Sequence, residues 1–256
     1  YGLVGSEMCI RDRPASVCMR VVPAERAPRD SYSYSSISAE LHEEGEDRAA
    51  ATGAPEGDDI DEAVTPSEVD ALRDERAALS RAGDPTALGS AFHAACQWLI
   101  ELDRADLPAE RVDALCRYWG CTPAQRERFD AAVARWLSSD VRAEALAWPC
   151  RRAEVPFYTL GMDGLVERFG PYAEGAIDLL CTDPARPGHA LLIDYKTGGS
   201  PDETPGRLHE KHRLQAEVYA DVLHKAGFER VTLKFVRVEV PDPVDPAQPQ
   251  VVTYEL

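Results

Sequence analysis

Two mostly apolar runs, 176–181 and 190–195, form the clearest pattern along the chain, and a Pro/Gly-rich connection at 184–188 separates them. Short apolar runs on either side of turn-forming residues are typical of the two strands of one hairpin. The pattern therefore predicts a β-hairpin, and we expect the rest of the domain to be organised around it.

Charged residues interrupt both predicted strands. Asp178 lies in the first, Asp194 lies in the second, and Lys196 follows two residues later. Because strand side chains alternate between faces, Asp194 and Lys196 point the same way and Tyr195 points the opposite way. Buried charge is costly unless it is paired or bound to a metal. This face is therefore either an ion pair at a strand end or an active site.

Helical spacing dominates the chain before the hairpin. Thr65 and Thr122 each open a capping box that has Pro at the first helical position. An apolar stripe from Leu88 to Leu102 predicts a further helix that begins near Thr86. His93 lies beside that stripe, where a histidine by itself is more often a packed or surface residue than a metal ligand.

After the hairpin, a helix is expected from Thr204 to Ala226, where Gly227 ends it. The predicted elements in chain order are helices at 65–80, 86–102 and 122–139, strands at 154–160, 176–181 and 190–195, the helix at 204–226, and strands at 231–240 and 251–256. This order predicts an α/β fold with a mixed sheet flanked by helices and with an N-terminal helical part.

Composition narrows the possible functions. The net charge of −17 argues against a simple basic nucleic-acid-binding module, but it does not exclude a nuclease, whose site must be acidic to hold metal. The seven cysteines are scattered and include no C-x-x-C pair, which suits a reducing cytoplasm rather than a zinc or disulfide framework. No apolar run approaches the ~20 residues that span a membrane, and no signal-peptide pattern opens the chain. The expected location is cytoplasmic.

The ends of the chain carry less pattern. Residues 1–30 are expected to be a disordered or artefactual tail, and 31–256 a single domain that contains a flexible acidic insert at 42–63. Because the first residue is Tyr1 rather than Met, we expect the chain to be a fragment of a longer protein.

Six short motifs occur in order: Ser-Tyr-Ser-Ser at 33–36, Leu-Gly-Ser-Ala-Phe-His at 88–93, Glu-Val-Pro-Phe at 154–157, Gly-Ala-Ile-Asp-Leu-Leu at 175–180, Ile-Asp-Tyr-Lys-Thr-Gly at 193–198 and Gln-Ala-Glu-Val-Tyr at 215–219. Each alone is weak, because Asp-x-Lys is common by chance. In this order and spacing, over residues 31–240, they resemble the PD-(D/E)XK nuclease domain of the RecB/AddA family, found at the C-terminus of bacterial helicase–nucleases. The resemblance implies a restriction-endonuclease-like fold. It also implies a Mg²⁺-dependent DNA exonuclease that processes double-strand breaks for recombinational repair by cutting strands unwound by an attached motor.

The resemblance also assigns roles to residues. Mg²⁺ prefers carboxylate and water ligands. By the resemblance, Asp178 and Asp194 would supply the carboxylates, and His93 and the backbone carbonyl of Tyr195 would be further ligands. Mn²⁺ could replace Mg²⁺. Lys196 would orient the attacking water, help to deprotonate it, or stabilise developing negative charge, and family membership does not decide among these roles.

Further residues would support the site. Gln215 and Tyr219 share one helix face and would brace Lys196 and line the DNA path. Glu154 matches a family position whose role is less defined. Lys211 and Arg213 are expected to contact phosphates in a salt-sensitive way.

Other features limit the comparison. The chain has no G-x-x-x-x-G-K-[ST] motif, so ATP would bind only to motor domains upstream of this sequence. No cysteine follows Cys181, so an iron–sulfur cluster of the AddB type is not expected. The expected partners are DNA, upstream helicase domains and an AddB-type or RecC-type subunit. Two alternatives remain: a stand-alone phage-type or restriction-type nuclease of the same fold, and a non-catalytic DNA-binding scaffold.

Overall fold

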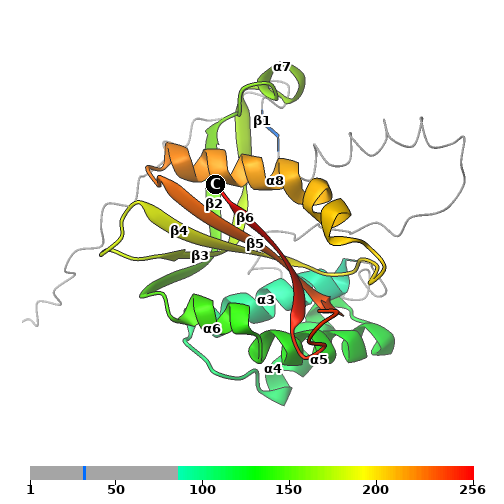
Figure 1. Cartoon of the computed structure of the whole chain (residues 1–256). Coiled ribbons are helices and arrows are strands. Elements are labelled where there is room, and N and C mark those ends of the chain that lie inside the picture. The colour runs from blue at the N-terminus through cyan, green and yellow to red at the C-terminus, as the bar shows by residue number, and fades with distance from the viewer. Residues whose placement is uncertain (1–30, 33–85) are drawn as a thin grey trace, which may run out of the picture.

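The computed structural model describes residues 31–32 and 86–256 (Figure 1). Four features expected from the sequence lie outside the described residues: the tail at 1–30, the motif at 33–36, the acidic insert at 42–63 and the helix at 65–80.

Within the described residues the elements follow one another as β1 (Ser31–Tyr32), α3 (Ala87–Glu101), α4 (Ala109–Trp119), α5 (Pro123–Leu137), α6 (Asp140–Leu146), β2 (Cys150–Leu160), α7 (Val166–Phe169), β3 (Tyr172–Thr182), β4 (His189–Lys196), α8 (Pro205–Lys225), β5 (Arg230–Pro241) and β6 (Pro249–Glu255). The predicted hairpin is confirmed as β3 and β4, which pair antiparallel. The capping box at Thr122 is also confirmed, because Thr122 and Gln125 each accept the backbone N–H of the other.

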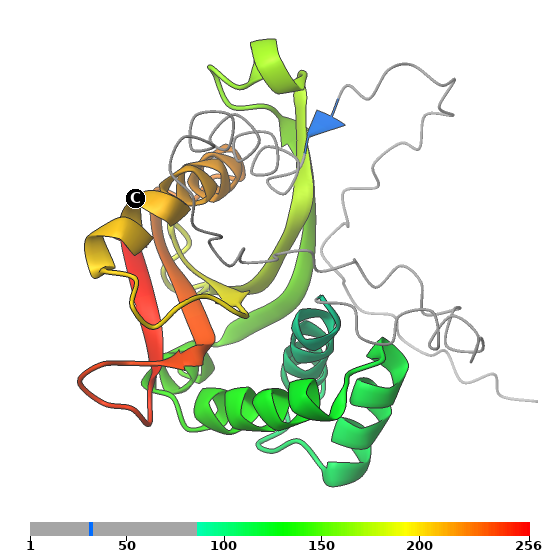
Figure 2. The ribbon, with the colours of Figure 1, turned by 90° about the vertical axis from the view of Figure 1, so that its right-hand side faces the viewer.

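The described strands form one mixed sheet of the order β1-β3-β4-β5-β6, with β2 paired to β3. β4 and β5 are parallel, and α8 makes the crossover between them. Helix α8 covers one face of the sheet, and α3 to α6 gather on the other (Figures 1 and 2). The predicted mixed sheet flanked by helices is therefore confirmed.

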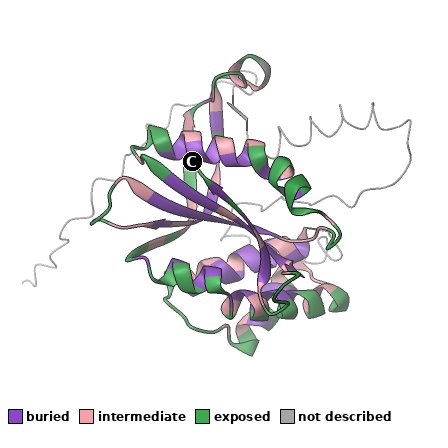
Figure 3. Cartoon of the chain, viewed as in Figure 1, coloured by how far each residue is buried: buried purple, intermediate pink, exposed green. Residues whose placement is uncertain are grey.

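Strand β4 lies at the centre of this arrangement. Its residues from Ala190 to Lys196 are all buried, since neighbouring strands lie on both sides and helices cover both faces (Figure 3). Leu191, Ile193 and Tyr195 pack among α3, α5 and α6, whereas Ala190 and Leu192 pack toward α8. Asp194 and Lys196 belong to the same alternating set as Ala190 and Leu192, so they are charged residues on a buried face.

Strands β3 and β4 separate near Asp178. β2 pairs with β3 over 150–153 and 155–160, whereas β4 pairs with β3 only over 179–182 and β1 pairs with it at 172–173. The other edge of β3 is therefore shared between β4 and β1, and the stretch 174–178 between them has no ladder partner there among the described strands. The hairpin opens at the point where its acidic residues lie.

Three described helices, α4, α6 and α7, were not predicted from the sequence pattern. None of the helices in the described part of the chain is both long and apolar enough to cross a membrane.

Candidate active site

Three carboxylates lie in one row across adjacent strands. The register pairs Ala153 with Leu179 and Val155 with Ile177, and it pairs Leu179 with Ile193 on the next strand. Continued by one residue, it aligns Glu154 on β2, Asp178 on β3 and Asp194 on β4. In place of a regular ladder bond, the Tyr195 backbone N–H donates to Asp178 Oδ2 at 2.6 Å. The acids therefore lie where β3 and β4 separate.

The backbone is unusual at one member of this row. Glu154 has a φ of +47°, a left-handed conformation that is uncommon for residues other than glycine. Side chains two apart on a regular strand share a face, yet Leu179 packs with α3 to α6 while Ile177 packs toward α8. The alternation of side chains between the two faces of the sheet is therefore broken at the row of acids. This break turns Glu154 and Asp178 toward α3.

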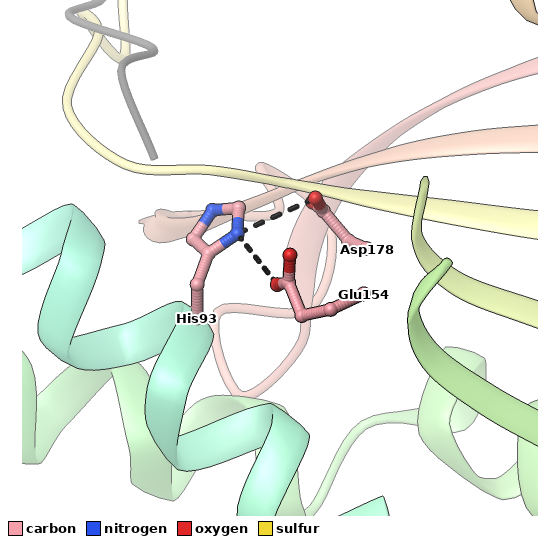
Figure 4. A group of neighbouring side chains, drawn as sticks. All are labelled: His93, Glu154 and Asp178. Atoms are coloured by element: carbon pink, nitrogen blue, oxygen red, sulfur yellow. Dashed lines mark ion pairs between the residues drawn. The ribbon is translucent and has the colours of Figure 1, made fainter. Parts of the chain in front are cut away.

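Helix α3 supplies a histidine to this row. His93 Nδ1 lies 3.4 Å from Asp178 Oδ1 and 3.6 Å from Glu154 Oε1 (Figure 4). Its Nε2 lies 3.3 Å from the carbonyl oxygen of Tyr195. The His93 ring also packs edge-on against the Tyr195 ring, so both its polar and its apolar contacts hold it in place.

A glycine one turn earlier lets α3 approach the end of β4. A Cβ at Gly89 would lie 2.9 Å from Thr197 Oγ1, closer than Cβ contacts normally come. The glycine in the Leu-Gly-Ser-Ala-Phe-His motif is thus explained by close packing against the residue that follows Lys196.

Asp194 has a different set of partners. Its Oδ1 lies 2.8 Å from Lys196 Nζ. Its Oδ2 accepts hydrogen bonds from Tyr219 at 3.0 Å and from Gln215 at 3.4 Å, both on α8. Burial and the negative charge of Asp194 raise the pKa of the Tyr219 hydroxyl, so it stays a donor at neutral pH. The Lys196 ammonium also lies over the ring of Phe235, a contact that the sequence did not predict.

The electrostatics reflect a surplus of negative charge. Burial lowers the pKa of His93, but Asp178 and Glu154 more than compensate, and the result lies well above the ordinary value. Burial and the charge of Asp178 raise the pKa of Asp194, whereas His93 and Tyr219 act in the opposite direction. Both shifts arise because buried carboxylates gather with little countercharge. A divalent cation among them would lower both pKa values.

The donor set fits such a cation. His93, Glu154 and Asp178 each offer one ligand atom, and these atoms all lie within 4.8 Å of one another. The carbonyl oxygen of Tyr195 is adjacent, in contact with the other His93 nitrogen. Carboxylate and carbonyl oxygens with one imidazole suit Mg²⁺ or Mn²⁺. The ligand set expected from the sequence named Asp194 but not Glu154, whereas Glu154 lies in the three-residue group and Asp194 lies beside it, held by Lys196.

The two predicted phosphate contacts lie apart from this centre, in the first half of α8. Lys211 lies one turn before Gln215 and pairs with Glu203 at 3.2 Å. Arg213 lies on the exposed side and pairs with Glu210 and Glu217 at 3.0 and 3.3 Å. Acidic residues therefore already neutralise both cations in part.

Comparison with known proteins identifies a family for this chain. The family model described as the PD-(D/E)XK nuclease superfamily matches residues 67–255, most of the chain and all of its described helices. The comparison with curated proteins gave no match. Among solved structures, the crystal structure of SSO0001 is 14% identical, and the alignment covers 75% of this chain and 77% of that one. Its TM-score is 0.30, and a likeness of that size supports no argument about function.

Proposed function

The chain belongs to the PD-(D/E)XK nuclease superfamily, and on that premise we propose that it hydrolyses DNA phosphodiester bonds at the row of Glu154, Asp178 and Asp194. Members of this superfamily are metal-dependent nucleases. The single observation that carries the proposal is that three carboxylates from three strands, two of them buried, meet His93 on one side and Lys196 on the other. A purely structural ion pair would need only Lys196 and one acid, and would not need the other two carboxylates or His93.

The metal chemistry fits these residues. A bound Mg²⁺ neutralises phosphate charge and supplies an activated water. His93, Asp178 and Glu154 would hold it, together with the Tyr195 carbonyl and an oxygen of Asp194. Asp178 is kept in place by the Tyr195 N–H, and the packing of His93 against Tyr195 fixes the imidazole.

Lys196 is placed to act on the water and the phosphate. Its ammonium is a hydrogen-bond donor and a positive charge held 2.8 Å from Asp194. Paired in this way, it would orient the attacking water and stabilise negative charge as it develops on the phosphate. Tyr219 and Gln215 fix the far oxygen of Asp194 and so fix Lys196 indirectly.

We further propose that the domain is the exonuclease of a RecB/AddA-type helicase–nuclease, with residues 31–256 as one nuclease domain. The motif order supports this proposal. The domain would degrade DNA strands delivered by an ATP-driven motor in upstream domains. It would work beside an AddB-type or RecC-type subunit in the repair of double-strand breaks. A stand-alone nuclease of the same fold is the competing proposal. Genomic sequence upstream of Tyr1 separates them: helicase motifs in frame favour the first, and a nearby start codon favours the second.

The test is cleavage of end-labelled single-stranded and duplex DNA by the chain with Mg²⁺, with Mn²⁺ or with EDTA, beside Lys196→Ala. Lys234→Ala is the matched control, because Lys234 lies on the neighbouring strand β5 but pairs with Glu144 of α6 rather than with an acid of the site. We expect metal-dependent cleavage that Lys196→Ala abolishes and Lys234→Ala retains. A folded protein that neither cleaves DNA nor binds Mn²⁺ through Asp178 would refute the nuclease proposal and favour a scaffold.

A further inference from the structure

Helix α4 ends in a motif that brings two cysteines together. Gly120 adopts φ +71°, the Gly120 N–H donates to the carbonyl of Arg117, and the Cys121 N–H donates to the carbonyl of Cys116 at 2.8 Å. These two bonds define a Schellman motif, in which the side chains at the positions of Cys116 and Cys121 commonly contact each other. In most proteins that contact is between apolar side chains; here both positions are cysteine.

The backbone geometry allows a disulfide between them. With standard bond lengths, a hydrogen bond of 2.8 Å limits the Cα–Cα distance of this pair to at most about 6.7 Å. Disulfides form when that distance lies between about 4.4 and 6.8 Å. The Cys121 thiol donates to the carbonyl of Ala87 at 3.6 Å, and the closeness of the two thiols lowers the pKa of Cys116 and raises that of Cys121.

The surroundings distinguish this pair from the other described cysteines. Cys96 and Cys181 are buried, and burial raises the pKa of both, that of Cys181 to about 12. Cys150 is exposed on β2, in another part of the chain. Cys116 is buried but Cys121 is only half-buried, so small oxidants can reach the pair from the Cys121 side.

We propose that Cys116 and Cys121 form a reversible redox-modification site, in which a peroxide oxidises the two thiols to a disulfide. The Cys116 thiolate attacks one peroxide oxygen, the O–O bond breaks, and the released hydroxide takes a proton to become water. The sulfur of Cys121 then attacks the resulting sulfenic acid, the S–O bond breaks, and the Cys121 proton leaves with the second water. Two thiols are oxidised and one peroxide is reduced. The proposal does not depend on nuclease activity.

Peptide mapping of the full chain tests it. Trypsin cuts after Arg111, Arg117 and Arg126, so Cys116 and Cys121 fall on separate peptides, 112–117 and 118–126. After brief treatment with hydrogen peroxide and blocking with N-ethylmaleimide, we expect these peptides to be joined and to separate with dithiothreitol. Because the two thiols are neighbours, this link should exceed any link to Cys150 by on the order of tenfold.

The variants provide the controls. Cys150→Ser should leave the link unchanged, whereas Cys116→Ser and Cys121→Ser should each abolish it. Mapping of the wild-type chain does not depend on how those variants fold. If Cys116 and Cys121 remain separately alkylated after Cys150 has been oxidised, or if Cys121 pairs mainly with Cys150, the proposal is wrong.

Discussion

Asp178 and Asp194 align on the adjacent strands β3 and β4, yet their surroundings differ. Asp178 has His93 at 3.4 Å and the Tyr195 N–H at 2.6 Å, with a second acid, Glu154, beside it. Asp194 has a Lys196 ammonium at 2.8 Å and two donors from α8. Asp178 thus shares His93 with a second acid, whereas Asp194 is held by Lys196 and by two neutral donors from α8. The difference suggests that Asp178 mainly attracts the metal and Asp194 mainly places Lys196.

The strongest test of this division replaces each acid in turn. We expect Asp178→Asn and Asp194→Asn each to reduce DNA cleavage by about 10³-fold or more, because each removes charge at the reacting centre. Mn²⁺ affinity, measured by titration calorimetry, should fall further in Asp178→Asn than in Asp194→Asn. Equal losses of Mn²⁺ affinity would show that Asp194 is as much a metal ligand as Asp178. The proposed division of roles between the two acids would then be wrong.

A smaller effect is expected at Glu154. Glu154→Gln keeps the shape of the side chain but removes its charge from the group around His93. We expect Mn²⁺ to bind at least about 10-fold more weakly, because even a carboxylate that only supports a metal ligand contributes about 10- to 100-fold in affinity. Glu229→Gln, at an exposed position before β5, is the control. Unchanged affinity in Glu154→Gln would exclude Glu154 from the site.

The raised pKa values predict a pH dependence of stability without metal. The folded-state pKa of Asp194 lies above its ordinary value, so raising the pH deprotonates the unfolded chain first and disfavours the folded state. The raised pKa of His93 acts in the same direction, since its contribution is lost as the pH rises through that pKa. With EDTA present, wild type should lose stability relative to Asp194→Asn as the pH rises above about 4, where the carboxyl of the unfolded chain ionises. Urea unfolding of wild type and Asp194→Asn at several pH values measures this difference. If the unfolding free energies of the two proteins change with pH in parallel, the prediction is wrong.

The smallest effects are expected on α8, away from both acids. Lys211→Ala should weaken binding of single-stranded DNA a few-fold and reduce the salt slope by about 0.7, the value for one phosphate contact. Arg213→Ala should do less, because Glu210 and Glu217 already pair with Arg213 on the exposed side. Fluorescence anisotropy at several salt concentrations measures both slopes. A larger change in Arg213→Ala would place the DNA path on the opposite side of α8.

Local pattern was enough to predict the elements that carry most of the site. The hairpin, the helix from Thr86 and the helix from Thr204 all have strong periodicity and clear ends, and the alternation on β4 placed Tyr195 opposite Asp194 correctly. Helices α4 and α6 were missed because each buries only three residues, too few for a recognisable stripe.

The arrangement around Glu154 could not be predicted from the sequence. Glu154 is the first residue of the strand predicted at 154–160, and its place in the Glu-Val-Pro-Phe motif was the signal that the sequence offered. Its nearness to His93 depends on the register of β2 against β3, on the left-handed backbone at Glu154 and on the packing of α3. These are properties of the folded chain that join residues about sixty positions apart.

The left-handed backbone at Glu154 sets the stability of the folded chain against the proposed metal-binding role of this residue. A left-handed residue that is not glycine costs on the order of 1 kcal/mol. Replacing Glu154 with glycine would relieve that cost and could yield a sturdier protein, but it would remove a carboxylate that faces His93. With Glu154 as the proposed metal ligand, selection for heat resistance alone would favour glycine at this position, and selection for activity would reject it.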